Sequence, residues 1–150
     1  MQRVLTFCAT VAFATASTVA VAEIISVASS RSVPETVDAL EAAATEAGLG
    51  IAARIDHAAG ATKAGMALPP GQVLIFGNPE VGTPAMQADP RAGLYLPLRV
   101  AVYEDADGKV WLIYEDPAAM MEGLDISADA PFVQAMTGAL AKLTATAAGD

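Results

Sequence analysis

Four side chains carry most of the chemistry that this sequence could support. His57 is the only histidine, and one imidazole can serve as a metal ligand or a proton shuttle near neutral pH. Asn78 stands between a glycine and a proline, Met86 offers a soft thioether, and Arg99 lies within an otherwise apolar run. Because binding groups collect at strand ends and in long loops, we expect these four side chains to converge beside a sheet.

Each of these residues also has a structural interpretation. A lone histidine often hydrogen-bonds a neighbouring loop, so metal or haem binding by His57 is the less favoured hypothesis. Asn78 in a Gly-Asn-Pro run is typical of a turn that ends a strand. Arg99 on an apolar strand requires a carboxylate or a ligand anion, and a salt bridge satisfies this requirement. Ligand binding and loop stabilisation therefore both remain open.

Several other chemistries lack their motifs. The Asp105-x-Asp107-Gly108 run begins like a calcium loop, but the later ligands and the closing glutamate are missing, so it predicts a hairpin turn. The sequence has no Gly-x-Ser-x-Gly elbow, no Gly-x-x-x-x-Gly-Lys phosphate loop and no Cys-x-x-Cys-His haem attachment site. The methionines outside the N-terminal segment are scattered, which favours core packing over a copper site.

The first 22 residues have the order of parts of a secretory signal peptide. One positive charge at Arg3 precedes an apolar run over 4–16, and Ala20-Val21-Ala22 predicts cleavage before Glu23. The run is interrupted by hydroxyl residues, which makes a retained membrane anchor the less favoured alternative. We therefore expect a periplasmic or secreted protein. The only cysteine, Cys8, would leave with the peptide, so the mature chain would contain no thiol.

Residues 23–150 form the second predicted unit, a single domain that must be stable without disulfides. Seventeen acidic and seven basic residues remain after cleavage, a net charge of −10. An acidic surface repels phosphate backbones and anionic lipid headgroups. We therefore expect no nucleic-acid binding and, once the signal peptide is cleaved, no membrane binding.

Periodicity predicts an α+β domain of strand, helix, four strands and helix, with both helices on one face of an antiparallel-dominated sheet. The first helix begins after a Ser32–Glu35 capping box and ends near Gly48, and the last is capped by Asp129 and frays from Ala145 onward. The predicted strands span 24–29, 51–55, 72–76, 96–103 and 109–114, and the segments 63–70 and 80–93 are predicted to be loops.

The order of short motifs resembles the bacterial and archaeal family called domain of unknown function 302. The resemblance rests on Ile55-Asp56-His57-Ala58-Ala59-Gly60-Ala61, Leu68-Pro69-Pro70, Phe76-Gly77-Asn78-Pro79, Gly82-Thr83-Pro84, Ala88-Asp89-Pro90, Leu96-Pro97-Leu98-Arg99-Val100 and Trp111-Leu112-Ile113-Tyr114. It implies a fold of the TATA-box-binding-protein-like α+β class and suggests a homodimer. It does not imply DNA binding, and it transfers no catalytic residue, because the family has no settled activity.

Three functional hypotheses follow. The first is a non-enzymatic binding module for a small ligand, a metal or haem cofactor, or a protein partner, with His57, Asn78, Met86 and Arg99 at its site. The second is a structural or assembly role as a homodimer without a ligand. The third is an enzyme that uses His57 as a general base, although the sequence identifies no partner for proton transfer. No particular cofactor is indicated.

Overall fold

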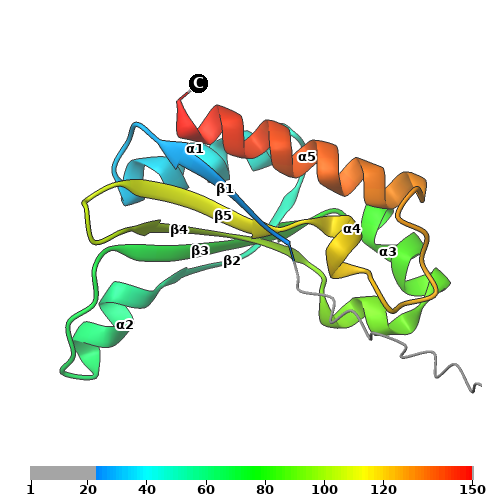
Figure 1. Ribbon diagram of the computed structural model, residues 1–150, viewed down its shortest axis with the longest axis horizontal. Helices are drawn as coiled ribbons and strands as arrows, with labels where there is room; N and C mark the ends of the chain where they lie inside the picture. The colour runs from blue at the N-terminus through cyan, green and yellow to red at the C-terminus, as the bar shows by residue number, and fades with distance from the viewer. Residues whose placement is uncertain (1–22, 150) are drawn as a thin grey trace, which may run out of the picture.

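The computed structural model describes residues 23–149, which form a five-stranded sheet covered on one face by two long helices (Figure 1). The predicted signal peptide and Cys8 lie outside the described residues. The elements in chain order are β1 (Ile24–Ser29), α1 (Val33–Glu46), β2 (Gly50–Asp56), α2 (His57–Lys63), β3 (Gly71–Gly77), α3 (Pro79–Ala88), the 3-10 helix η1 (Pro90–Leu94), β4 (Leu98–Glu104), β5 (Val110–Glu115), α4 (Pro117–Met120) and α5 (Pro131–Ala148).

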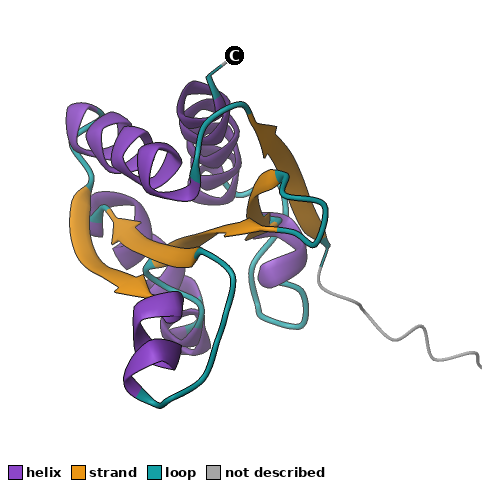
Figure 2. Ribbon diagram, turned by 90° about the vertical axis from the view of Figure 1, so that its left-hand side faces the viewer, coloured by secondary structure: helices purple, strands orange, loops and turns teal. Residues whose placement is uncertain are grey.

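The sheet has the order β1-β5-β4-β3-β2, and each neighbouring pair is antiparallel. Helices α1 and α5 pack side by side on one face, which confirms the predicted α+β architecture (Figures 1 and 2). Helix α2 projects on the other side of the sheet (Figure 2). No helix within residues 23–149 is long and apolar enough to span a lipid bilayer.

The core lies between the sheet and the two long helices. Along β4, Leu98, Val100 and Val102 are buried, whereas Arg99 and Tyr103 are exposed, as the two-residue period of a strand predicts. The helices contribute apolar side chains at three- and four-residue spacing, including Leu40 of α1. Burial of these side chains is the main source of stability in a domain whose described residues contain no cysteine.

The predicted start of α1 is confirmed. The Glu35 carboxylate accepts hydrogen bonds from the Ser32 amide at 3.0 Å and from the Ser32 hydroxyl at 2.6 Å. These bonds hold the pKa of Glu35 below its ordinary value. The first turn therefore has a local polar cap, and Pro34 lies where a missing N–H costs nothing.

The predictions for the last helix were wrong at both ends. Helix α5 begins at Pro131, and Ala130, not Asp129, is its N-cap residue. Its end does not fray before Ala148, because the Ser30 amide donates to the Ala148 carbonyl at 3.1 Å and the Arg31 guanidinium donates to the Ala147 carbonyl at 2.8 Å. A cation is also favourable at a helix C-terminus, where the carbonyls leave a partial negative charge.

Two segments without predicted structure are helical. Residues 57–63, which follow β2, form α2, whose first turn is capped by the Asp56 carboxylate. Most of the predicted loop 80–93 is α3 followed by η1. Hydrophobic periodicity did not predict either helix, because their small residues and prolines form no clear apolar stripe. Pro84 also lies inside α3. The 105–108 hairpin turn was predicted correctly, with Gly108 at φ 76°.

Candidate functional site

An apolar cavity of about 450 Å³ opens at the end of the sheet where β2 begins and β3 ends. Its walls come from residues 49–52, the end of β3, the first two turns of α3, residues 96–98 and residues 135, 136 and 139 of α5. Helix α3 lies against α5 at this end of the molecule, so the cavity is enclosed by elements distant in sequence (Figure 1). Its size falls within the range of small-molecule sites.

The cavity lining has a simple chemistry. None of its eighteen residues carries a charged side chain, and only Asn78 and Thr83 carry a polar one. Phe76, Leu96 and Met136 provide bulky apolar surface, and Met86 adds a second thioether. Such walls favour an uncharged, largely apolar molecule, since a bare charge would lose its hydration without gaining a partner.

Two close approaches of backbone shape the cavity. A Cβ added to Gly77 would lie 3.3 Å from the Pro97 Cβ atom, so a side chain at this position would press on the residue that enters β4. A Cβ added to Gly82 would meet the Leu96 Cδ1 atom at 3.6 Å. Glycine at these positions therefore lets the neighbouring segments approach closely and adds no side chain to the cavity.

Asn78 caps α3 and lines the cavity. Its Oδ1 atom accepts from the Glu80 amide at 2.8 Å, and its carbonyl accepts from the amides of Val81 at 3.0 Å and Gly82 at 2.9 Å. The predicted role in ending a strand is therefore confirmed. The amide nitrogen Nδ2 has no partner among the described residues.

The structure brings together two of the four residues predicted for the site. Asn78 and Met86 both line the cavity. His57 does not, because it follows Asp56, which pairs with Gln72 at the other end of the β2–β3 pair from Gly50 and Gly77. At about 3.3 Å per residue, this places His57 about 20 Å along the strand from the cavity.

His57 is exposed at the start of α2 and has no hydrogen-bond partner for its ring among residues 23–149. In the same part of the chain, no three His, Cys, Asp or Glu side chains are grouped to hold a metal ion. The geometry around His57 therefore offers neither the predicted loop contact nor a set of companion ligands.

Arg99 lies on the sheet face opposite α1 and α5. Its Nη2 atom donates to Glu115 Oε2 at 2.8 Å, and about half of the arginine side chain is exposed. The salt-bridge interpretation of Arg99 is thus the one that the structure supports. A hollow of about 310 Å³ surrounds this pair, with Val73, Ala101 and Ile113 among its walls.

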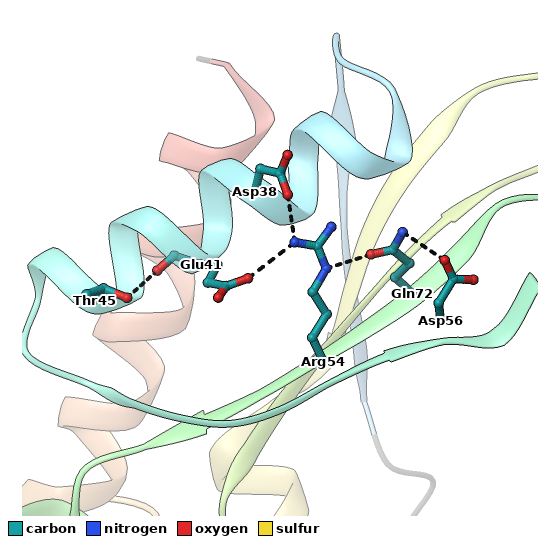
Figure 3. A network of polar contacts seen from close by, with 6 residues as sticks. All are labelled: Asp38, Glu41, Thr45, Arg54, Asp56 and Gln72. Carbon is teal, nitrogen blue, oxygen red and sulfur yellow. Dashed lines mark hydrogen bonds and ion pairs between the residues drawn. The ribbon is translucent and has the colours of Figure 1, made fainter. Parts of the chain in front are cut away.

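A second polar cluster ties β2 to α1 (Figure 3). Arg54 donates through Nη1 to Asp38 at 2.6 Å and to Glu41 at 3.2 Å, and through Nε to Gln72 at 2.8 Å. The hydrogen bond that the Arg54 guanidinium donates to Asp38 raises the pKa of Arg54. Arg54 Nη1, Arg54 Nε and Gln72 Nε2 all donate to protein acceptors, so we assign the cluster a structural role in holding the edge strand to α1.

A third cluster fastens η1 to the loop before α5. The buried Asp89 carboxylate pairs with Arg91 through Nη2 at 2.6 Å and accepts from the Asp125 amide at 3.0 Å. These contacts hold the pKa of Asp89 well below its ordinary value. The hydrogen bond from the Arg91 side chain is the largest cause, followed by those from the backbone amides of Asp125 and Arg91. This tie connects η1, which lies between Met86 and Leu96 in the sequence, to the loop before α5.

The cavity itself was not predicted from the sequence. Its apolar walls have the composition of ordinary core, and only the ordered run Phe76-Gly77-Asn78-Pro79 pointed to this end of the sheet. The contributions of Met136 and of residues 49–52 could not be found without knowing that α5 and the start of β2 line the same cavity.

Fold and cavity define a small α+β domain with an apolar pocket at one end of a half-covered sheet. The sequence profile of the family described as "Domain of unknown function DUF302" matches residues 25–147. The chain belongs to this family.

A solved relative has the same fold. The crystal structure of an uncharacterized conserved protein DUF302 from Bacillus stearothermophilus superposes with a TM-score of 0.74 over 83% of this chain and 97% of that chain, at 18% sequence identity. At this identity the likeness concerns the fold alone.

Two curated relatives are longer proteins. The chain is 43% identical over 129 residues to "Fluoride-specific ion channel FluC 1" of Brucella suis biovar 1 (strain 1330), covering 85% of this chain and 50% of that protein. The same identity and share of this chain hold for "Fluoride-specific ion channel FluC 1" of Brucella abortus biovar 1 (strain 9-941), of which 47% is covered. The chain thus spans about half the length of the curated relatives it matches.

Proposed function

We propose that this domain is a non-enzymatic binding module that takes a small, uncharged, largely apolar molecule into the cavity between β2, β3, α3 and α5. The observation that carries the proposal is the lining, which combines about 450 Å³ of space with eighteen residues free of charged side chains. A cavity of this size and polarity is the ordinary form of a small-molecule site.

The names of the longer relatives concern whole proteins, of which this chain spans half. A fluoride ion entering this cavity would find no cationic side chain. The proposal therefore assigns the domain a neutral ligand. We extend it to the location suggested by the N-terminal pattern, an exported protein whose mature chain begins at Glu23. The intact mass of the protein purified from its natural compartment tests that extension.

The binding proposal is tested with N-phenyl-1-naphthylamine, an uncharged dye that fluoresces in apolar surroundings. The wild-type protein should enhance its fluorescence in a saturable manner. Gly82→Leu should abolish saturable binding or weaken it at least ten-fold, because a side chain at Gly82 is directed at Leu96 across the cavity.

A matched control is Gly138→Leu, at a helical glycine of α5 with open space around its missing Cβ. Both substitutions gain about 1 kcal/mol of helix propensity, so they separate occupation of the cavity from a change in helix stability. Unchanged binding in Gly82→Leu, or equal loss in both variants, would contradict the proposal.

A second candidate function is assembly as a homodimer through the face of the sheet opposite α1 and α5. Its side chains are mostly apolar, including Ile24, Ile55, Val73, Ile75 and Ile113. Five strands about 4.8 Å apart and about 20 Å long make a flat area of about 500 Å², before the relief of the side chains is counted. A standard dimer buries about 800 Å² per partner, so the relief of the side chains must supply the remaining area.

The second copy is the occupant that this face favours, because Arg99 and Glu115 provide one charge of each sign for a two-fold partner. Sedimentation velocity tests the idea. Ala101→Glu places a new charge in the middle of the face and should yield monomers, whereas Ala141→Glu on the exposed side of α5 should leave the dimer intact. A monomeric wild-type protein at micromolar concentration would refute the assembly role while leaving the cavity proposal standing.

A further inference from the structure

Asn78 lines the cavity, and its oxygen atoms accept hydrogen bonds within the protein while its side-chain NH₂ group remains free to donate to a ligand. Its side-chain oxygen accepts from the Glu80 amide at 2.8 Å, and this bond fixes which end of the amide is oxygen. Its backbone oxygen accepts from Val81 and Gly82. The acceptors are thus engaged in capping α3, and the side-chain NH₂ group is left over.

The leftover NH₂ group is accessible. Among the described residues, every buried side-chain nitrogen or oxygen atom has a hydrogen-bond partner. Nδ2 of Asn78 has none, so it is one of the polar atoms that solvent reaches, and it belongs to a residue that lines the cavity. The backbone amides of Glu80, Val81 and Gly82 donate to Asn78 itself, so the backbone of the helix start contributes no competing donor there.

We propose that the cavity selects neutral molecules with an apolar body and one hydrogen-bond acceptor, such as a ketone or ester carbonyl, and that Asn78 Nδ2 donates to this acceptor. The inference deepens the proposed function and rests on it. The apolar body lies against Phe76, Leu96 and Met136, where thioether–aromatic contact also favours a flat ring. A neutral donor suits a carbonyl, whereas a carboxylate would find no cation in this lining.

The test uses two probes of nearly equal shape, 2-acetylnaphthalene and 2-ethylnaphthalene, each displacing N-phenyl-1-naphthylamine. Only the first has an acceptor oxygen. Asn78→Asp keeps an oxygen to cap the Glu80 amide and removes the NH₂ donor. Asn78→Ser keeps a capping oxygen without adding a charge, and its single hydroxyl proton lies on a shorter side chain that does not reach the place of Nδ2.

Both variants should weaken binding of 2-acetylnaphthalene about ten-fold, which is the size of one net hydrogen bond, and leave 2-ethylnaphthalene within two-fold of wild type. Thermal denaturation verifies that each variant folds. Equal affinity of wild type and variants for the ketone would overturn the inference while leaving the cavity proposal intact. An equal loss for both probes would also overturn it, because the effect would not depend on the acceptor. If neither probe binds the wild-type protein, the proposed function fails and this inference fails with it.

Discussion

Met136 contributes to the core and to the wall of the cavity, so its truncation has two separable effects. The side chain is 3% exposed and lies on the sheet-facing side of α5. Met136→Ala removes three heavy atoms and should lower the free energy of unfolding by about 3 kcal/mol. For a domain of this size, about 4 °C of melting temperature accompanies each kcal/mol, so we expect a decrease of about 12 °C.

The effect on binding follows from the wall that is lost. A thioether in contact with an aromatic ring contributes about 1 kcal/mol, which corresponds to about a five-fold weaker affinity for N-phenyl-1-naphthylamine. The matched control is Leu140→Ala, one turn further along α5. Leu140 is 1% exposed and does not line the cavity, so its loss should destabilise the protein to a similar degree.

Differential scanning fluorimetry and dye titration are then read together. We expect both variants to melt earlier and only Met136→Ala to bind the dye more weakly, with Leu140→Ala within two-fold of wild type. The reasoning would be refuted if the two variants had equal affinities, because Met136 would then act as core alone and the dye would bind elsewhere.

Two further predictions concern hydrogen-bonded carboxylates. Since the pKa of Asp89 is held below its ordinary value of 3.8, its stabilising contribution is present above that value and is lost as the pH falls through the lower, folded-state value. Asp89→Asn should therefore unfold at lower urea than wild type at neutral pH, with a difference that shrinks toward about pH 2, and a constant difference would contradict the linkage. Trp111 Nε1 donates to Asp105 Oδ2 at 2.8 Å and is the main reason that the pKa of Asp105 is lowered. In Asp105→Ala the single tryptophan should change its emission wavelength, and an unchanged spectrum would show that this bond is absent in solution.

Alternation and capping made the sheet and the two long helices predictable. Along β4 the two-residue period places Arg99 and Leu98 on opposite faces, as the burial of these residues shows. The Ser32–Glu35 spacing located the start of α1 because capping is a local interaction between neighbours in sequence. These signals depend only on residues a few positions apart.

The cavity depends on contacts between distant segments, so the sequence could not specify it. The expectation that His57, Asn78, Met86 and Arg99 share a site treated all strand ends as equivalent. In an antiparallel pair, however, the C-terminal ends of consecutive strands lie at opposite ends of the strand pair. His57, which follows β2, is therefore far from Asn78, which follows β3. Arg99 does not reach the cavity, because its side chain lies on the face of the sheet that points away from the helices.

The most direct measurement of the central claim is a titration of N-phenyl-1-naphthylamine followed through the methionine methyl groups in ¹³C NMR spectra. Met86 and Met136 line the cavity, whereas Met66, Met120 and Met121 do not. The account predicts that the signals of Met86 and Met136 shift in proportion to occupancy while the other three stay in place. Shifts at Met66, or unmoved signals at both cavity methionines, would contradict it.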